Sequence, residues 1–436
     1  MRPSRSGVWL AGVMVGAGSL LPVPLAALPE APVENIRAVA LPEAGLENIG
    51  AEPAADLENI GAEPAGAGEP AGPTVPAELT VPAGPTAGAD TPVTLADDAW
   101  HYSQWRDGRH DTFYTEWWYF NLHDPRAGID AIFSYFASNP DDIGGLGMVQ
   151  MVAVAYTADG TVRAIDRYPV GEFDAGEASA DVRIGDNRAW READGTYRVA
   201  GKSLDGRLEW ELEYAGDGAP WFAADRMLVG PTGAERKAWE AMSWLVQMPR
   251  ARVGGTVRVD GREYVVRGSG YHDHNWGEWI PTDATWNWAQ FSGPRVAIEV
   301  GDFIGKPVGV VALDLDGTRT VFLPDQYSLV HTRWGWDRVN RLFFPTESLL
   351  TADNGALRLE VTLRALKTEP LRGDLPAPLR DLIIYEQTAR FEGRVWEWVS
   401  AEGVGGASAD GSEGAGEWRV RSPVRGMGFK EWTGKK

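Results

Sequence analysis

The chain of 436 residues contains no cysteine, which excludes disulfide bonds, thiol nucleophiles and zinc–thiolate sites. Basic residues are also few: 41 Lys and Arg stand against 62 Asp and Glu, and the formal net charge is −21 at pH 7. This balance argues against nucleic acid as a partner. No Gly-x-Ser-x-Gly elbow is present either, which argues against a serine hydrolase. Catalysis, if present, must come from Asp, Glu, His, Tyr, Ser or Lys side chains.

Residues 1–27 have the build of a secretory signal peptide. Two arginines precede an apolar stretch from Val8 to Leu21, and small residues follow at Ala26 and Ala27. An uncleaved membrane anchor is the alternative, although the four glycines of residues 1–27, together with Pro22 and Pro24, make a poor spanning helix. We therefore expect a secreted or periplasmic protein, and the N-terminal segment leaves proximity to a membrane open.

Residues 28–95 are rich in Pro, Ala, Gly and Glu, and Leu46–Ala54 recurs as Leu57–Ala65. Eleven acidic residues and one basic residue give this segment about half of the net charge of the chain. So few apolar side chains cannot bury enough surface to offset the entropy of ordering. The composition predicts a disordered, acidic spacer.

Nineteen of the 20 tryptophans lie between Trp100 and Trp432. Short alternating runs recur there, and Asp-Gly pairs at 159–160, 260–261 and 316–317 indicate hairpins. Helical periodicity is scarce, with Glu235–Trp244 as one candidate for a short helix. The pattern predicts an all-β fold of antiparallel barrels or sandwiches. Its length favours two β-domains, 96–250 and 251–436, with the boundary at the Pro-containing stretch Met248–Arg252.

The densest chemistry lies between Gly270 and Gly277, where a phenol, two imidazoles, a carboxylate, an amide and an indole follow one another. In a strand, side chains alternate between faces, so one face would carry Tyr271, Asp273 and Asn275, and the other His272, His274 and Trp276. Polar side chains on both faces are tolerated only beside a cavity, an interface or a hydrogen-bond network. We expect a functional site here, with Asp273 buried and hydrogen-bonded.

A second signature runs from Glu116 to Asn121. Strand alternation would put Glu116, Trp118 and Phe120 on one face, and Trp117, Tyr119 and Asn121 on the other. A carboxylate among indoles is either held by a buried arginine or kept near neutrality by desolvation, and the second state is a usable acid.

Three Trp-x-Trp pairs occur at 286/288, 334/336 and 396/398, and each pair would share one face of a sheet. Core packing is one interpretation, and a pocket for a long apolar or polyene ligand is the other. Gln290 would lie on the face of Trp286 and Trp288. His272 and His274 also share a face, as in several metal sites, but His331 or Glu299 would have to complete the ligands and no spacing supports either. We therefore expect no metal.

The segments Phe113–Phe120 and Tyr271–Gly277 together resemble the lipocalin-like superfamily of carotenoid 1,2-hydratases (hydroxyneurosporene synthases), AttH-like secreted proteins and fungal Diels–Alderases. The resemblance spans roughly residues 96–436 and implies two tandem lipocalin-like β-domains, a ligand cleft between or within them, and no cofactor. Asp273 and Trp276 match positions shared by the hydratase-like and AttH-like forms, and the two histidines and Asn275 are closer to the hydratase form. The secretion signal is similar to that of the AttH-like group and argues against an intracellular role in carotenoid synthesis.

The resemblance and the residues together predict a cofactor-independent hydratase or cyclase that protonates an alkene of an isoprenoid or polyene. The alternative is a non-catalytic, AttH-like lipid-binding protein. We expect a monomer whose partner is an apolar small molecule. We also expect five tryptophans to gather, at least in part, around one cleft that joins the two halves: Trp117, Trp118, Trp276, Trp286 and Trp288. The catalytic candidates are Asp273, His272, His274 and Glu116, and the ligand-binding candidates are Tyr271, Asn275, Trp276, Trp117, Trp118, Tyr119, Trp286, Trp288 and Gln290.

Overall fold

The computed structural model describes residues 92–106, 114–227, 242–277, 285–372, 382–400 and 416–435. Most of them lie in β-strands, which confirms the predicted all-β fold class. The helical segments are very short: η1 (Ala96–Asp98), α1 (Tyr102–Trp105), η2 (Ile143–Gly145), η3 (Val170–Glu172) and η4 (Ala224–Arg226). No helix within the described ranges is long and apolar enough to cross a membrane. The predicted signal peptide and the spacer up to residue 91 lie outside these ranges.

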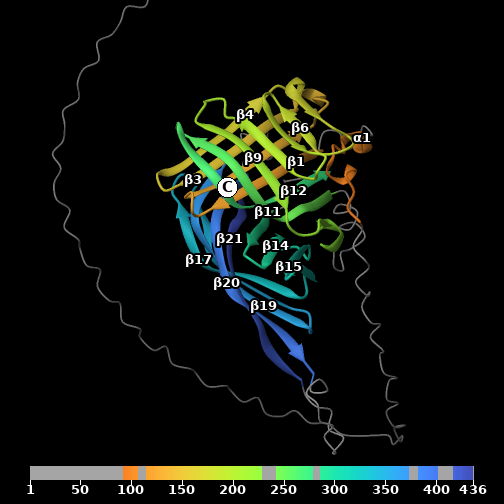
Figure 1. The fold of residues 1–436 in the computed structure, drawn as a ribbon, viewed down its shortest axis with the longest axis vertical. Helices are drawn as coiled ribbons and strands as arrows, with labels where there is room; N and C mark the ends of the chain where they lie inside the picture. Colours follow the sequence, from red (N-terminus) through yellow and green to blue (C-terminus); the bar gives the residue numbers. More distant parts are fainter. Residues whose placement is uncertain are drawn as a thin grey trace, which may run out of the picture. The chain divides into compact units, whose positions relative to one another are not determined.

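Twelve antiparallel strands form the first sheet (Figure 1). Their bounds are β1 (Thr115–Asp124), β2 (Ile129–Ser138), β3 (Met148–Thr157), β4 (Gly160–Tyr168), β5 (Phe173–Ala175), β6 (Asp181–Ile184), β7 (Asn187–Arg191), β8 (Tyr197–Lys202), β9 (Leu208–Gly216), β10 (Trp221–Phe222), β11 (Met242–Val259) and β12 (Arg262–Gly277). Eleven follow the order β4-β3-β2-β1-β12-β11-β9-β8-β7-β6-β5, and β10 pairs with β11. This order places the two polar signature strands, β1 and β12, side by side at the centre of the sheet.

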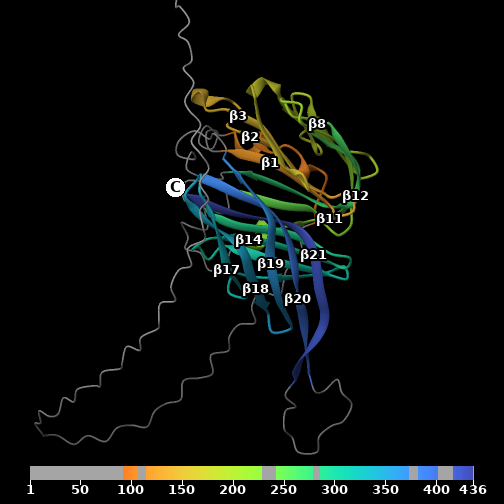
Figure 2. The same cartoon turned by 90° about the vertical axis from the view of Figure 1, so that its left-hand side faces the viewer.

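The first sheet curls around a core of its own inward-facing side chains. The ring of Phe133 in β2 lies 4.8 Å from that of Trp210 in β9. The hydroxyl of Tyr135, also in β2, donates to the carbonyl oxygen of Ala200 in β8 at 3.3 Å. Because these strands are far apart in the sheet order, the contacts close the sheet into a barrel around this core (Figure 2).

The predicted Asp-Gly hairpins are confirmed. Asp260-Gly261 joins β11 to β12 with φ angles of 48° and 81°, and Asp316-Gly317 has φ angles of 56° and 80°. Two successive residues with positive φ define the type I′ turn, whose twist matches that of the flanking strands, and Asp-Gly is among the pairs that best tolerate it. The local sequence therefore determines these connections.

The predicted boundary at residues 250 and 251 falls inside β11, which continues through both residues. Pairing of β11 with β12 is irregular between Val246 and Ala251, and this irregularity accommodates Pro249 without ending the strand. The first sheet therefore extends to Gly277. Of the predicted helix, residues 242–244 begin β11, and the remainder lies outside the described ranges.

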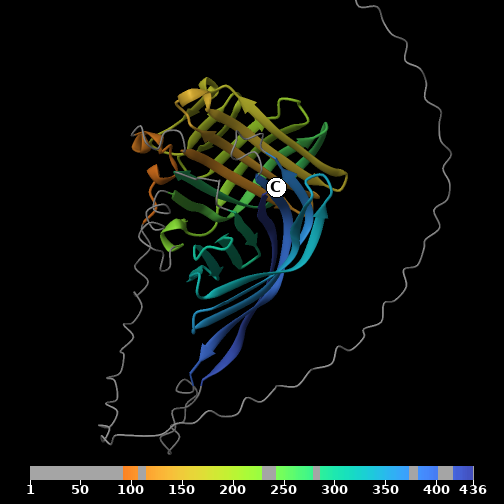
Figure 3. The same cartoon turned by 180° about the vertical axis from the view of Figure 1, so that it is seen from behind.

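Nine antiparallel strands form the second sheet, in the order β16-β15-β14-β13-β21-β20-β19-β18-β17 (Figure 3). Their bounds are β13 (Trp286–Ser292), β14 (Val296–Phe303), β15 (Gly309–Leu315), β16 (Thr318–Phe322), β17 (Tyr327–Asp337), β18 (Leu342–Asp353), β19 (Leu357–Leu371), β20 (Leu382–Val399) and β21 (Glu417–Lys435). One face of this sheet encloses a second core, which includes Phe291, Leu313 and Phe391.

A third buried cluster contains side chains from both sheets, and we call it the intersheet layer. Tyr119, Tyr271 and Trp244 come from the first sheet, and Phe303 and Phe429 from the second. All of the described residues fall in one compact unit, so this layer belongs to a single folded body. Both faces of the β1–β12 pair are therefore buried, one toward the barrel core and one toward the second sheet.

Gly428 in β21 lies between β13 and β20, and an added Cβ atom would collide with the main-chain carbonyl of Gln290. Because backbone cannot move aside as a flexible side chain can, we expect Gly428→Ala to lower the free energy of unfolding by ~1–3 kcal/mol. Urea unfolding measures the change. Gly171, where an added Cβ meets open space, supplies the control, and Gly171→Ala should change stability by less than about 0.5 kcal/mol.

Candidate functional site

Strands β1 and β12 pair so that the two sequence signatures lie directly opposite one another. Trp118 faces His274 and Phe120 faces His272, whereas Tyr119 faces Asp273 and Asn121 faces Tyr271. Residues directly opposite in an antiparallel pair project to the same side of the sheet. The predicted alternation is thus confirmed, and it divides the polar side chains between two buried surfaces.

The barrel-facing surface holds a chain of carboxylates and imidazoles. Asp98, from the segment before β1, lies 3.1 Å from Nε2 of His272 and 3.2 Å from Nδ1 of His274. Nε2 of His274 lies 2.8 Å from Oε1 of Glu116, which is also 3.2 Å from Nδ1 of His101. All five side chains are buried. The first sheet therefore contains an internal ionic network at the predicted motif.

The network favours a charged imidazole at its centre. Burial alone would lower the pKa of His274, but the neighbouring Asp98 and Glu116 carboxylates raise it to about 9. Burial would likewise raise the pKa of Asp98, yet the neighbouring His272 and His274 hold it well below its ordinary value. A buried arginine was one of the two alternatives for Glu116, and imidazoles and the Tyr114 hydroxyl stand in that place; the hydroxyl donates to Oε2 of Glu116.

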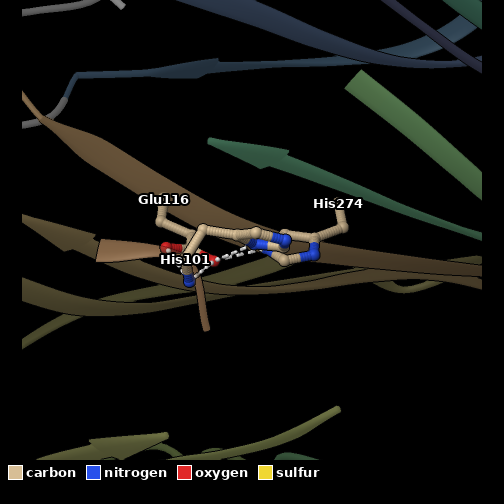
Figure 4. Close-up of side chains that lie close together, drawn as sticks. All are labelled: His101, Glu116 and His274. Carbon is tan, nitrogen blue, oxygen red and sulfur yellow. Dashed lines mark hydrogen bonds and ion pairs between the residues drawn. The ribbon is translucent and has the colours of Figure 1, made fainter. Parts of the chain in front are cut away.

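Three of these side chains could hold a metal ion. Nδ1 of His101, Nε2 of His274 and a carboxylate oxygen of Glu116 lie within 4.8 Å of one another, and Figure 4 shows the three groups converging. Of the pair inferred from sequence, His274 belongs to this group and His272 does not. His331 and Glu299, the ligands considered earlier, lie in the second sheet and outside the group.

The intersheet surface of β12 holds Asp273, which is 3% exposed. Its Oδ2 accepts hydrogen bonds from the Tyr271 hydroxyl at 2.8 Å and from Nε1 of Trp244 at 2.9 Å, and Oδ1 accepts from Nδ2 of Asn275 at 3.1 Å. Burial raises the pKa of Asp273 to about 7, although the bonds from Tyr271 and Trp244 act in the opposite direction. The predicted burial and hydrogen bonding of Asp273 are confirmed.

A second acidic group faces Asp273 from the second sheet. Glu386, Glu431 and Trp288 are neighbours across β20, β21 and β13. The Tyr119 hydroxyl donates to Oε1 of Glu386 at 3.2 Å, and Nε1 of Trp286 donates to Oε2 of Glu431 at 2.9 Å. Burial and the Glu431 carboxyl raise the pKa of Glu386 well above its ordinary value. The surroundings of Glu386 therefore favour its protonated form, and it lies beside a second carboxyl group.

Glu299 is a further buried carboxyl group in the intersheet layer, on the strand face that also carries Gln290. Burial raises its pKa well above the ordinary value. Neither carboxyl oxygen has a hydrogen-bond partner among the described residues. Gln290 itself donates from Nε2 to the carbonyl oxygen of Pro249 at 3.1 Å, so it joins the two sheets as well.

Of the five tryptophans predicted to gather, at least in part, around one cleft, three border the same layer and two do not. Trp118 and Trp276 lie on the barrel side of the first sheet, whereas Trp117, Trp286 and Trp288 border the intersheet layer. The reason is the period of two, which separates Glu116 from Asp273 by the thickness of the sheet. Core packing is wrong for three other tryptophans, which are about half exposed: Trp334, Trp336 and Trp398.

Sequence reasoning missed Asp98, His101, Glu299 as an acid, Glu386 and Glu431. The first two precede the signature by many residues in an unremarkable polar stretch. Glu386 and Glu431 lie in long strands, where the polar run after Tyr385 and the Lys430-Glu431-Trp432 sequence were the available signals. Long-range strand pairing, which the sequence does not reveal, brings Glu386 and Glu431 together.

No protein-family model and no curated protein matches the chain. Among solved structures, a candidate AttH protein from Nitrosomonas europaea has a similar fold, with a TM-score of 0.57 and 17% identity over 80% of this chain and 99% of that chain. For kievitone hydratase from Nectria haematococca the TM-score is 0.49 and the identity is 15%, over 79% of this chain and 95% of that chain. For CghA in complex with Sch210972 the TM-score is 0.47 and the identity is 14%, over 74% of this chain and 89% of that chain.

The first of these similarities confirms, for the fold, the resemblance to AttH-like, lipocalin-like proteins. At such low identity the similarity extends to the arrangement of strands, and residue roles do not transfer with it. The chemistry must therefore be argued from the side chains of this chain.

Proposed function

We propose that this protein is a hydratase or cyclase that protonates an alkene of an apolar isoprenoid or polyene in the intersheet layer. The supporting observation is Asp273, a buried carboxyl group whose pKa of about 7 leaves about half of it protonated at neutral pH. Its hydrogen-bond donors, Tyr271, Trp244 and Asn275, are all neutral. A general acid works best when its pKa lies near the working pH.

The surroundings of Asp273 suit a carbocation. The ring of Trp288 lies 5.2 Å from that of Tyr119 and 5.7 Å from that of Tyr271, so three aromatic rings stand beside the acid. Aromatic faces attract cations electrostatically. Trp288, Trp286 and Glu431 are half-buried, so each side chain is partly accessible to solvent. An apolar chain entering between them would meet Asp273.

In the proposed reaction, the Asp273 carboxyl transfers its proton to the less substituted alkene carbon. The π electrons form the new C–H bond, and the tertiary carbon becomes positive. In a hydratase, water forms the C–O bond and gives its proton to the Asp273 carboxylate, which restores the acid, so that one water is added. In a cyclase, a second alkene attacks the cation, and a carboxylate removes a proton to give an isomer of the substrate.

The test is incubation of the purified protein with acyclic terpenoids and polyenes in deuterated, heavy-oxygen water, followed by mass spectrometry. Carbon-bound deuterium with one heavy oxygen identifies a hydratase, and deuterium without added oxygen identifies a cyclase. Substrates recovered unlabelled but bound, with quenched tryptophan fluorescence, would instead support the lipid-binding alternative and refute catalysis. Absence of turnover of every substrate in the panel would also count against the proposal.

The pH dependence of turnover provides a second prediction. Because the reaction needs neutral Asp273, turnover should be high below pH 7 and fall as the pH rises through about 7. The Tyr271 hydroxyl stabilises the carboxylate and lowers this pKa. Tyr271→Phe should therefore move the falling limb to higher pH by about one unit, which corresponds to the loss of one hydrogen bond to a charged group. If turnover of the Tyr271→Phe chain falls over the same pH range as that of the unaltered chain, the titrating group is not Asp273.

A further inference from the structure

We propose that His101, Glu116 and His274 bind one divalent zinc-type ion inside the first barrel. The donors would be Nδ1 of His101, Nε2 of His274 and Oε1 of Glu116. Oε1 already lies 3.2 Å and 2.8 Å from the two nitrogens (Figure 4). Donors around tetrahedral zinc, with bonds of about 2.0–2.1 Å, stand about 3.3 Å apart. Small outward movements of these side chains would make room for an ion.

The donor set selects the class of ion. Two imidazole nitrogens with one carboxylate suit zinc and neighbouring transition metals, whereas calcium and magnesium favour ligand sets made of oxygen alone. The sequence supports the same choice, because three of the six histidines of the chain gather in this network.

A second layer of contacts orients the donors. Nδ1 of His274 faces Asp98 at 3.2 Å, and Asp98 is itself held by Nε2 of His272 and by the Tyr197 hydroxyl. Metal-bound histidines commonly direct their other nitrogen to a carboxylate, which fixes the tautomer and the ring orientation. Asp98 is in the position for that role.

The remaining contacts of the donors are equally specific. The Tyr114 hydroxyl donates to the other oxygen of Glu116, and the main-chain N–H of His101 donates to the same carboxylate at 3.1 Å. Glu116 is therefore held on both oxygens, with Oε1 directed toward the imidazoles.

Stacked indoles enclose the group. The His101 ring lies parallel to Trp276, with 3.8 Å between ring centres, and the His274 ring stacks on Trp118 at 4.4 Å. Glu116 and His274 are fully buried, and His101 is 5% exposed. Rigid walls of this kind hold ligands in place and limit the access of solvent.

The ion would add a further link between parts of the chain that are far apart in the sequence. His101 precedes α1, whereas Glu116 and His274 lie in β1 and β12. A bound ion would fasten the segment before β1 to the centre of the first sheet. This inference is independent of the proposed catalysis, because Asp273 projects from the opposite face of the same strands.

The experiment uses the full chain with any purification tag removed, stripped with a chelator and then dialysed. Elemental analysis and zinc titration calorimetry should find one zinc per chain, and zinc should raise the melting temperature by several degrees. His101→Ala and Glu116→Gln should each weaken zinc binding by roughly tenfold or more and abolish most of the thermal shift. His331→Ala, a histidine of the second sheet, is the matched control and should behave as the unaltered chain.

Cobalt(II) substitution keeps the test decisive if a variant fails to fold. The visible spectrum of the cobalt-loaded, unaltered chain should show the intense bands of four-coordinate cobalt. Absence of stoichiometric zinc from the unaltered chain, or equal zinc binding and equal stabilisation in the His101→Ala and His331→Ala chains, would overturn the inference. The buried groups would then be an ionic network without metal.

Discussion

Asp273→Asn is expected to lower turnover of the alkene substrate by about 10²–10⁴-fold, the usual contribution of a positioned general acid. Asparagine has nearly the same shape as aspartate and can still accept hydrogen bonds from Tyr271 and Trp244. It has no carboxyl proton to give to carbon. Binding of the substrate, measured by tryptophan quenching, should therefore change much less than the turnover number.

Asp302→Asn is the matched control for this variant. Asp302 also accepts from a tyrosine hydroxyl, that of Tyr327 at 3.0 Å, and from an amide, that of Asn287 at 2.9 Å. It lies in β14 on the opposite face from Trp288 and Glu299. Turnover should survive in this variant. Equal activity in the Asp273→Asn and unaltered chains would show that another group, with Glu386 first among them, supplies the proton.

The sequence was most informative where side-chain periodicity determines the outcome. Alternation along residues 116–121 and 271–276 correctly assigned every side chain to a face, and Asp-Gly pairs located hairpins, because both depend on neighbours in the chain. The same alternation separates Glu116 from Asp273, since their side chains have opposite directions once the strands pair in this register.

What could not be predicted depends on pairing between distant strands. Glu386 and Glu431 become neighbours through the pairing of β20 with β21, and Tyr119 reaches Glu386 only because the two sheets face each other. His101 reaches Glu116 because the short segment before β1 folds back over the barrel. Pro249 suggested a break, yet a local irregularity of pairing absorbed it. In each case a tertiary contact outweighed the local pattern.

The largest loss of stability is expected from Asp98→Asn, which should lower the free energy of unfolding of the zinc-free chain by ~3–5 kcal/mol. Asp98 lies 3.1 Å from His272 and 3.2 Å from His274, and all three side chains are buried. Removing one charge from a buried network leaves the remaining charges without compensation. Urea unfolding measures the change.

Asp181→Asn tests whether burial causes this loss. Asp181 pairs with Arg188 at 2.8 Å, but both side chains are more than a third exposed: Asp181 at 43% and Arg188 at 34%. Exposed pairs contribute only about 0–1 kcal/mol, because water solvates and screens both charges. If Asp98→Asn costs no more than Asp181→Asn, the buried network is not ionic. The double variant Asp98→Asn with His274→Gln locates the unfavourable charge. If Asp98→Asn alone shows the full loss of unfolding free energy and the double variant does not, the uncompensated charge lies on the His274 imidazole, since contacting partners give non-additive effects.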